Sequence, residues 1–216
     1  MAQIDRSFTG IDAVFATHEH SDHIRGIGPL LRKYKAPFYT TEGTWRRSQH
    51  IIGKIDTYNI IRASEPVDLD ELSGEPYSTP HDAEEPVAFV IHYQDKSLGI
   101  ATDLGRITPE VKKALQNLDA LLIEANHDIS MLEAGPYPWM TKKRIKSGVG
   151  HLSNEDCGEL LASVNHFGLK LVVLMHISET NNHPELAKIT ALQALGESLP
   201  KLILAQQNHP TELLSV

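Results

Sequence analysis

The sequence predicts a single α/β domain over residues 1–216, with β-strands enclosed between helices. Short apolar runs of strand length alternate with longer segments whose apolar residues recur at helical spacing. The length suits one sizeable core, and no linker, repeat or low-complexity segment divides the chain. These observations favour one folding unit in which strands and helices alternate.

The expected elements follow from apolar periodicity and from the turn residues between them. Strands are expected at 11–17, 37–40, 58–62, 67–69, 75–79, 119–124, 170–175 and 202–205, with a hairpin of 87–93 and 97–101. Helices are expected at 22–35, 42–51, 108–118, 126–132, 139–146, 153–167 and 183–198. Thr108 before Pro109, and Ser153 in a Ser-x-Glu-Asp sequence, are typical helix starts.

Composition narrows the class of protein. No apolar run approaches the ~20 residues that cross a membrane, and the first residues lack the pattern of a signal peptide, so no membrane partner is expected. Cys157 is the only cysteine and cannot form an internal disulfide, which indicates a reducing, cytoplasmic compartment. The net charge of −8 argues against wholesale coating by nucleic acid but allows a local basic patch.

A dense group of metal-ligand residues follows the first strand, in the sequence His18-Glu19-His20-Ser21-Asp22-His23. In extended chain, residues two apart point the same way, so His18 and His20 are expected to bind one metal. The chain then turns into a helix, which directs Asp22 and His23 toward a second metal. Imidazoles with a carboxylate suit zinc, and also manganese or iron.

Three further candidate ligands, His81, Asp103 and His176, each end a predicted strand. A lone residue of this kind is usually structural, but strand ends converge on one rim of a sheet. Together with the first motif they complete a site for two divalent metal ions. The expected first site is His18, His20 and His81, the second is Asp22, His23 and His176, and Asp103 lies between them. A bridging carboxylate and a bridging hydroxide are the usual needs of a two-metal hydrolase.

The order and spacing of these residues resemble the metallo-β-lactamase superfamily. Four segments resemble its WalJ (YycJ) group: THEHSDHIRG (17–26), IEANHD (123–128), GHLSN (150–154) and HISETNN (176–182). The resemblance covers about residues 10–210 and implies an αβ/βα sandwich. In the family, two or three strands normally precede the strand before the metal motif. Here about ten residues precede Ile11, so the sandwich is expected to lack those strands and to leave one sheet edge unpaired.

The resemblance implies a binuclear metal-dependent phosphodiesterase, a DNA exonuclease linked to repair, with a metal-bound hydroxide as nucleophile. Asp103 supports this, because a β-lactamase of the fold commonly has Cys there. His20 replaces the Glu of the diiron oxidoreductases, and neither the β-CASP insertion nor the arm of tRNase Z is present. Two alternatives stay open: a glyoxalase-type thioester or lactone hydrolase, and a non-catalytic metal-binding interaction module.

Asp22, Glu124 and His151 are the expected catalytic residues. Glu124-Ala125 at a strand end and Gly150-His151-Leu152-Ser153 resemble two tRNase Z segments whose Glu and His form a proton relay. The alternative for His151 is a capping loop that leads into the helix at Ser153.

A basic run just upstream of His151 is a candidate phosphate-binding segment, formed by Lys142, Lys143, Arg144 and Lys146. Loops and helix ends at sheet rims often carry binding sites, so these side chains are expected to contact a nucleic acid, in particular DNA. A solvated helix face is the alternative. Tyr137 and Trp139 could stack on a base, although packing in the core is the expected role for both.

Overall fold

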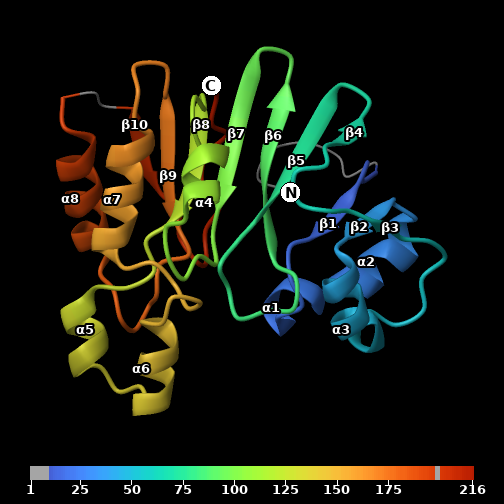
Figure 1. Ribbon diagram of the computed structural model, residues 1–216, viewed down its shortest axis with the longest axis horizontal. Helices are drawn as coiled ribbons and strands as arrows, with labels where there is room; N and C mark the ends of the chain where they lie inside the picture. The colour runs from blue at the N-terminus through green and yellow to red at the C-terminus, as the bar shows by residue number, and fades with distance from the viewer. Residues whose placement is uncertain (1–9, 198–199) are drawn as a thin grey trace.

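Two β-sheets form the framework of the molecule, and this computed structural model describes residues 10–197 and 200–216 (Figure 1). The small sheet is parallel, in the order β1 (Val14–Ala16), β2 (Phe38–Thr40) and β3 (Asn59–Ile60). The large sheet has the order β10-β9-β8-β7-β6-β5-β4. Its strands are β4 (Val67–Leu69), β5 (Leu72–Ser78), β6 (Val87–Tyr93), β7 (Lys96–Ala101), β8 (Ala120–Glu124), β9 (Leu171–Met175) and β10 (Lys201–Leu204).

The strands of the large sheet change direction at its middle. Neighbours from β4 to β7 are antiparallel, whereas β7, β8, β9 and β10 run parallel to one another. Parallel strands place their carboxyl ends at one edge, so the loops after β7, β8 and β9 meet there. The end of β1 joins this edge, because Val87 N donates a 3.0 Å hydrogen bond to Thr17 O.

Helices cover the sheets on their outer sides (Figure 1). Beside the small sheet lie α1 (Ser21–Ile24), α2 (Ile27–Tyr34) and α3 (Glu42–Ile52). Over the large sheet lie α4 (Pro109–Ala114), α7 (Asn154–Val164) and α8 (Pro184–Leu195), while α5 (Ile129–Ala134) and α6 (Trp139–Ile145) project beyond its lower edge. No helix in the described part of the chain is long and apolar enough to span a membrane.

Alternation along the parallel strands separates two apolar faces. Leu121 and Ile123 of β8 pack in the main core with Leu160 of α7. Ala120 lies on the opposite face, where a hollow of about 680 Å³ is lined by sheet residues and by the C-terminal residues 205–216. The helices thus cover one face of β8 to β10, where Leu202 and Leu204 of β10 are only partly buried, and leave the other face partly open.

The helix predicted at 22–35 is in fact two helices. α1 ends at Ile24, and α2 begins at Ile27 after Gly26. Pro29 explains the restart, because proline lacks an N–H and is tolerated only in the first turn of a helix. The break leaves α1 as a short turn that carries Asp22 and His23.

Other predicted boundaries also shift for local reasons. The helix predicted at 126–132 starts at Ile129, because the Asp128 side chain accepts a hydrogen bond from Met131 N (2.8 Å) and caps it there. The helix predicted at 153–167 ends at Val164, and the one at 108–118 ends at Ala114. The first strand is shorter than 11–17, and the helix predicted at 183–198 already ends at Leu195, before Gly196.

The expected loss of N-terminal strands can be followed only from residue 10 onward. No strand precedes β1 in the described residues 10–13, and residues 1–9 lie outside them. Within the described chain, β1 has β2 as its one strand partner, so its other edge is unpaired there.

A buried pair of amides fixes the loops around the rim to the sheet. Asn154 and Asn182 donate to each other's side-chain oxygens at 2.9 and 2.8 Å, and both are buried. Asn182 Nδ2 also donates to Ala125 O at 2.8 Å, just beyond the end of β8. The pair therefore ties the start of α7 and the loop after β9 to the same strand end.

We expect Asn182→Ala to lower the free energy of unfolding by roughly 2–3 kcal/mol, because the Asn154 amide and the Ala125 carbonyl would lose partners while buried. Urea unfolding measures this difference. Asn208→Ala, at an exposed position, serves as the matched control. An Asn182→Ala protein as stable as the control would show that water replaces the amide pair without cost.

Candidate metal centre

Three imidazoles converge beyond the end of β1. His18 Nε2 lies 3.0 Å from His20 Nδ1, and His81 Nε2 lies 3.2 Å from the same nitrogen. The three rings offer ligand atoms within 4.8 Å of one another, and His18 and His81 are buried. The structure therefore brings together the three residues predicted to share one metal.

Partners on the far side of two of these rings hold them in place. His81 Nδ1 donates to Gly150 O at 3.1 Å, and Thr17 Oγ1 lies 3.1 Å from His18 Nδ1. In each ring this leaves Nε2 facing the centre. Position 150 requires glycine, because a Cβ there would lie 2.2 Å from Ile145 O.

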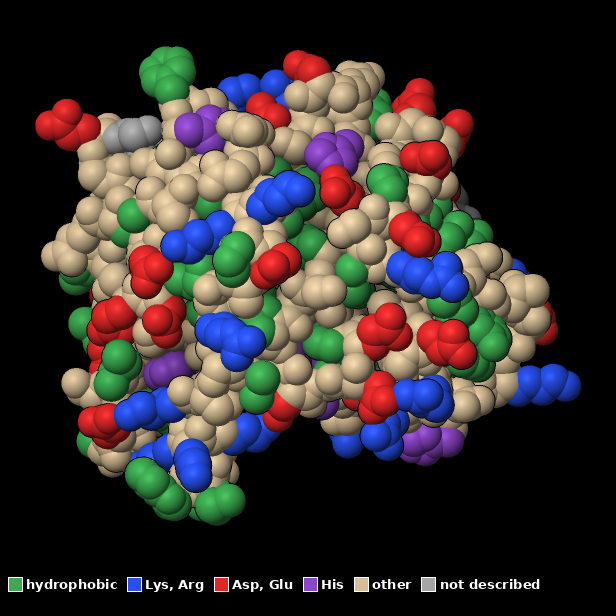
Figure 2. All heavy atoms as spheres, viewed as in Figure 1, with side chains coloured by type: hydrophobic (Ala, Val, Ile, Leu, Met, Phe, Trp, Pro, Cys, Tyr) green, Lys and Arg blue, Asp and Glu red, His purple; other side chains and the backbone are tan. Residues whose placement is uncertain are grey.

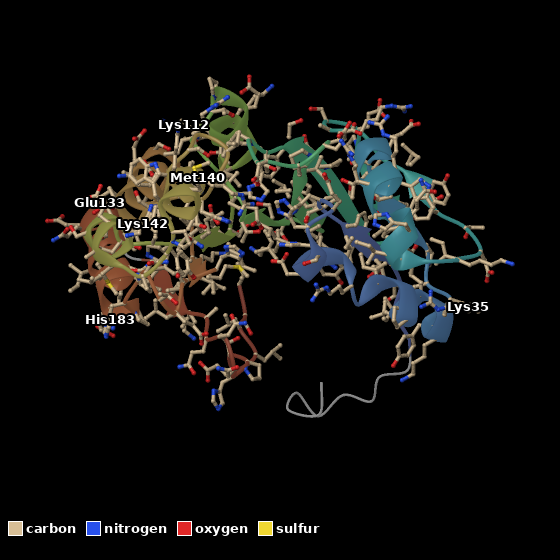
Figure 3. All side chains as sticks on the ribbon, turned by 90° about the horizontal axis from the view of Figure 1, so that it is seen from below. Lys35, Lys112, Glu133, Met140, Lys142 and His183 are labelled. Carbon is tan, nitrogen blue, oxygen red and sulfur yellow. The ribbon has the colours of Figure 1, made fainter. Side chains whose placement is uncertain are left out.

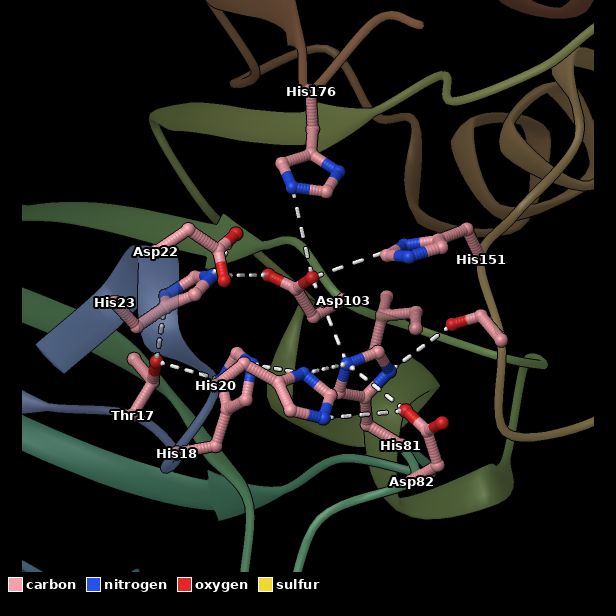
Figure 4. Close-up of polar contacts among 12 residues, drawn as sticks. Thr17, His18, His20, Asp22, His23, His81, Asp82, Asp103, His151 and His176 are labelled. Carbon is pink, nitrogen blue, oxygen red and sulfur yellow. Dashed lines mark hydrogen bonds and ion pairs between the residues drawn. The ribbon is translucent and has the colours of Figure 1, made fainter. Parts of the chain in front are cut away.

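Asp103 lies in the middle of the cluster (Figure 4). Its Oδ1 is 3.8 Å from His81 Nε2 and 3.6 Å from His176 Nε2, and its Oδ2 is 3.6 Å from His23 Nε2. Asp103 and His176 both have left-handed backbone conformations, with φ of 58° and 56°. Such conformations are uncommon for residues other than glycine and cluster at functional sites. Here they turn both side chains from the strand ends into the rim.

The residues predicted to bind the second metal lie less close together than those predicted to bind the first. His23 shares a compact group with His18 and Asp103, whereas Asp22 is 72% exposed and lies with Oδ2 3.5 Å from His23 Nε2. Asp22 thus lies at the outer edge of the cluster. Glu19, counted as a possible donor in the sequence, instead accepts a hydrogen bond from Glu84 N at 2.8 Å.

The Glu124 carboxylate, at the end of β8, lies completely buried behind the cluster. It accepts hydrogen bonds from three backbone N–H groups, those of Asp103 (3.0 Å), Leu104 (2.9 Å) and Leu152 (2.9 Å). These residues belong to the loop after β7 and to the loop before α7. One carboxylate therefore fixes two loops of the rim to the strand between them.

Two imidazoles also contact this carboxylate. His151 Nδ1 and His176 Nδ1 each lie 3.2 Å from Glu124 Oε2. Burial alone would raise the pKa of Glu124, but hydrogen bonds from the two imidazoles lower it to about 2. Burial would lower the pKa of His176, but its hydrogen bond to Glu124 and the charge of Asp103 raise it to about 9.

Glu124 is therefore an anion that keeps Nδ1 of both rings as the donor side, so Nε2 of each ring is left for other contacts. Asp103, Glu124, His151 and His176 are close enough to be considered as a metal group themselves. Five donors already surround the carboxylate, however, and they occupy its acceptor sites. This geometry indicates that Glu124 positions the rings of His151 and His176.

The donor set suits divalent metal ions. Burial and then the neighbouring imidazoles, His23 first, lower the pKa of His18 to about 2, so its ring is neutral and has a free lone pair. A tetrahedral zinc ion that binds two imidazole nitrogens at ~2.1 Å separates them by roughly 3.4 Å. The spacings of 3.0 and 3.2 Å at His20 Nδ1 are close to that separation.

Asp82 is a residue of the rim that the sequence reasoning missed. Its Oδ1 lies 3.5 Å from His81 Nε2 and 3.7 Å from His20 Nε2. The Arg144 guanidinium binds both of its oxygens, with Nη2 2.9 Å from Oδ1. Although burial would raise the pKa of Asp82, the hydrogen bond from Arg144 lowers it. The pair connects α6 directly to the first imidazole group.

The basic segment is partly engaged within the protein. Arg144 binds Asp82, Lys142 Nζ donates to Glu133 O at 2.7 Å, and Lys146 forms an ion pair with Glu133. Lys143 is exposed and has no ion pair within the described part of the chain. The four predicted phosphate ligands therefore differ, and Lys143 is the one whose charge is least neutralised.

The residues that sequence reasoning missed lie next to residues that it identified. Thr17 precedes His18, Asp82 follows His81, and Gly150 precedes His151. Asn126, two residues after Glu124, donates to His176 O at 3.0 Å. Their position next to a predicted site residue was the one indication in the sequence. Side chains that support a ligand have no characteristic spacing of their own.

We expect Glu124→Gln to weaken metal binding by roughly 10- to 100-fold, because the amide cannot accept all five hydrogen bonds and would let His176 and Asp103 turn. Calorimetric titration of metal-stripped protein measures this affinity. Glu133→Gln, on the exposed helix α5, is the matched control. Unchanged affinity in a folded Glu124→Gln protein would contradict the positioning role.

Comparison with known proteins agrees with this geometry. Residues 2–177 match the family described as a beta-lactamase superfamily domain. Exodeoxyribonuclease YycJ of Bacillus anthracis is 37% identical over 197 residues, which cover 90% of this chain and 75% of that protein. Exodeoxyribonuclease WalJ of Streptococcus pneumoniae serotype 2 is 37% identical over 202 residues, which cover 92% of this chain and 75% of that protein.

Solved structures share the architecture. The metallo-beta-lactamase fold protein YhfI from Bacillus subtilis superposes with a TM-score of 0.71 at 18% identity, covering 94% of this chain and 78% of that chain. Zn(2+)-bound PqqB from Methylobacterium extorquens superposes with a TM-score of 0.69 at 22% identity, covering 98% and 77%. The predicted fold class and family are confirmed: the chain belongs to the beta-lactamase superfamily, in the group of the exodeoxyribonucleases YycJ and WalJ.

Proposed function

We propose that the protein is a two-metal phosphodiesterase that removes nucleotides from a DNA end. The observation that carries this proposal is the position of Asp103 between the two predicted groups: its Oδ1 faces His81 of the first group and His176 of the second, and its Oδ2 faces His23 of the second. A carboxylate so placed suits two ions that share one bridging ligand. The names of the two relatives, both exodeoxyribonucleases, support DNA as the substrate.

Seven residues would hold the two ions, with Asp103 shared. His18, His20 and His81 would hold the first, and Asp22, His23 and His176 the second. When bound, zinc or manganese (or iron) would polarise the scissile phosphate and make a water nucleophilic at neutral pH. Asp22 would serve at the exposed edge, where it can reach an incoming substrate as well as the second ion.

His151 would supply the proton that the leaving oxygen needs. Glu124 holds its Nδ1 at 3.2 Å, so Nε2 is the ring atom that can exchange a proton at the rim. The side chain of His151 is 15% exposed, whereas Glu124 is fully buried. Glu124 would therefore act through His151, and it would not touch the substrate.

Basic side chains on α6 would bind the phosphates that flank the cleaved bond. Lys143 is free to do so, and Lys142, Arg144 and Lys146 would exchange their internal partners for phosphate. This favours a nucleic acid over the thioester or lactone alternative, which needs no basic rim. The seven converging donors favour an enzyme over a non-catalytic module. A cytoplasmic location and a role in DNA repair accompany this proposal as predictions.

The direct test is turnover of end-labelled DNA, with a nitrophenyl phosphodiester and a nitrophenyl thioester compared under zinc and manganese. We expect both phosphodiesters to be cleaved and the thioester to be left intact. Asp103→Asn should bind fewer than two ions per chain by elemental analysis and should lose turnover of both phosphodiesters. Preferred cleavage of the thioester, or one ion in the fully loaded native protein, would contradict the proposal.

His151→Ala should slow DNA cleavage by ~10²–10⁴-fold with its metal content unchanged, because an alkoxide leaves poorly unless it is protonated. The nitrophenyl diester should be affected much less, since nitrophenolate is stable as an anion. His50→Ala, at an exposed position on α3, is the control. Loss of metal from His151→Ala would identify a ligand instead, and equal slowing of both substrates would exclude proton donation to the leaving group.

A further inference from the structure

Helix α6 exposes two large apolar side chains beside its lysines. Trp139 is 74% exposed and Met140 72% exposed, in the first turn of the helix. The sequence-based expectation of core packing for Trp139 is therefore wrong. α6 projects beyond the edge of the sheet and buries Ile145, near its other end, so the first turn has no core to pack against.

The exposed turn is fixed in place. Pro138 precedes Trp139 and has a fixed φ of −55°, and Lys142 N donates to Pro138 O at 3.1 Å. The opposite end of α6 is held by the buried Ile145 and by the ion pair of Arg144 with Asp82. A surface that is already ordered loses little conformational entropy when it binds a partner.

The position of this turn relative to the metal centre is defined by Arg144. Its partner Asp82 lies against His81 and His20, so the end of α6 touches the rim. At 1.5 Å per residue, Trp139 lies about 8 Å further along the helix. Stacked nucleotides rise 3.4 Å each, so about two to three nucleotides span this distance.

The charged side chains around the exposed turn indicate which kind of partner it would bind. Figure 2 shows hydrophobic and basic side chains together on the lowest part of the molecule, over α5 and α6. Figure 3, which views this side, places Met140 and Lys142 on one helix with Glu133 of α5 nearby. The chain as a whole carries a net charge of −8, so this local group of cations is set apart. Aromatic side chains beside cations are the usual means of binding single-stranded nucleic acid.

We infer that Trp139 and Met140 form a stacking surface for unpaired bases of the substrate, two to three nucleotides beyond the part of the strand that lies at Arg144. This inference rests on the proposed function and makes it more specific, because the substrate end must be single-stranded or frayed to present its bases. Lys143 would bind the backbone between the stacked bases and the metal centre. A blunt duplex would have to open before it could occupy the same surface.

Tryptophan fluorescence tests this directly, because the chain has two tryptophans. Trp45 stacks on Tyr58 with ring centroids 4.1 Å apart, in α3 away from α6. The Trp45→Phe variant leaves Trp139 as the single reporter. Titrating it with oligothymidylates in the presence of a chelator measures binding without any turnover.

We expect oligonucleotides of four or more residues to quench Trp139, and a dinucleotide to do so much less. Trp139→Ala should raise the Kd for single-stranded oligonucleotides by roughly 5- to 150-fold, measured by fluorescence anisotropy of a labelled strand. Trp139→Phe, which keeps an aromatic ring, should restore most of the affinity. Both variants should unfold at the same urea concentration as the parent, since the side chain is exposed.

Three outcomes would overturn the inference. The first is an unchanged Kd for Trp139→Ala. The second is a Trp139 emission that responds to phosphatidylserine vesicles and not to oligonucleotides, which would identify a membrane contact. The third is a response that depends on protein concentration alone, which would identify a second copy of the chain. DNA turnover by Trp45→Phe with added metal is measured separately. Turnover without stacking would contradict only this inference, and stacking without turnover would contradict only the proposed function.

Discussion

The rim of this protein depends on one buried carboxylate. An ionised carboxylate in a protein interior is costly unless hydrogen bonds and charges compensate it. Glu124 is compensated by three backbone N–H groups and two imidazoles, which come from the loops after β7 and β9 and the loop before α7. Because all these donors must stay in place for Glu124 to remain buried as an anion, the loops are fixed relative to one another.

The arrangement of the chemical groups follows from this constraint. Glu124 binds the backbone N–H of Asp103 and Nδ1 of His176, so it sets the position of the central carboxylate and the orientation of one imidazole. The same oxygen sets the ring of His151. A second link, from Asp82 to Arg144, joins the imidazoles of His20 and His81 to α6. The proposed metal ligands, the proposed proton donor and Arg144 of the basic segment are thus joined by one network of hydrogen bonds and ion pairs.

The sequence predicted much of this and missed the rest for physical reasons. The convergence of His18 and His20 could be predicted because side chains two residues apart in extended chain point the same way. The break before Pro29 could have been predicted from proline alone. The contacts of Asp82 could not be predicted, because its partner Arg144 lies 62 residues away in the sequence. The exposure of Trp139 could not either, since it depends on where α6 leaves the sheet.

A crystal structure of the protein loaded with manganese, with anomalous difference maps, tests the central claim most directly. The account predicts two peaks that share Asp103 as a ligand, one bound by His18, His20 and His81 and the other by Asp22, His23 and His176. It also predicts that Glu124 still binds the backbone amides of Asp103 and Leu152 and touches neither ion. A peak bound to Glu124, or a single peak with Asp103 turned away, would contradict it.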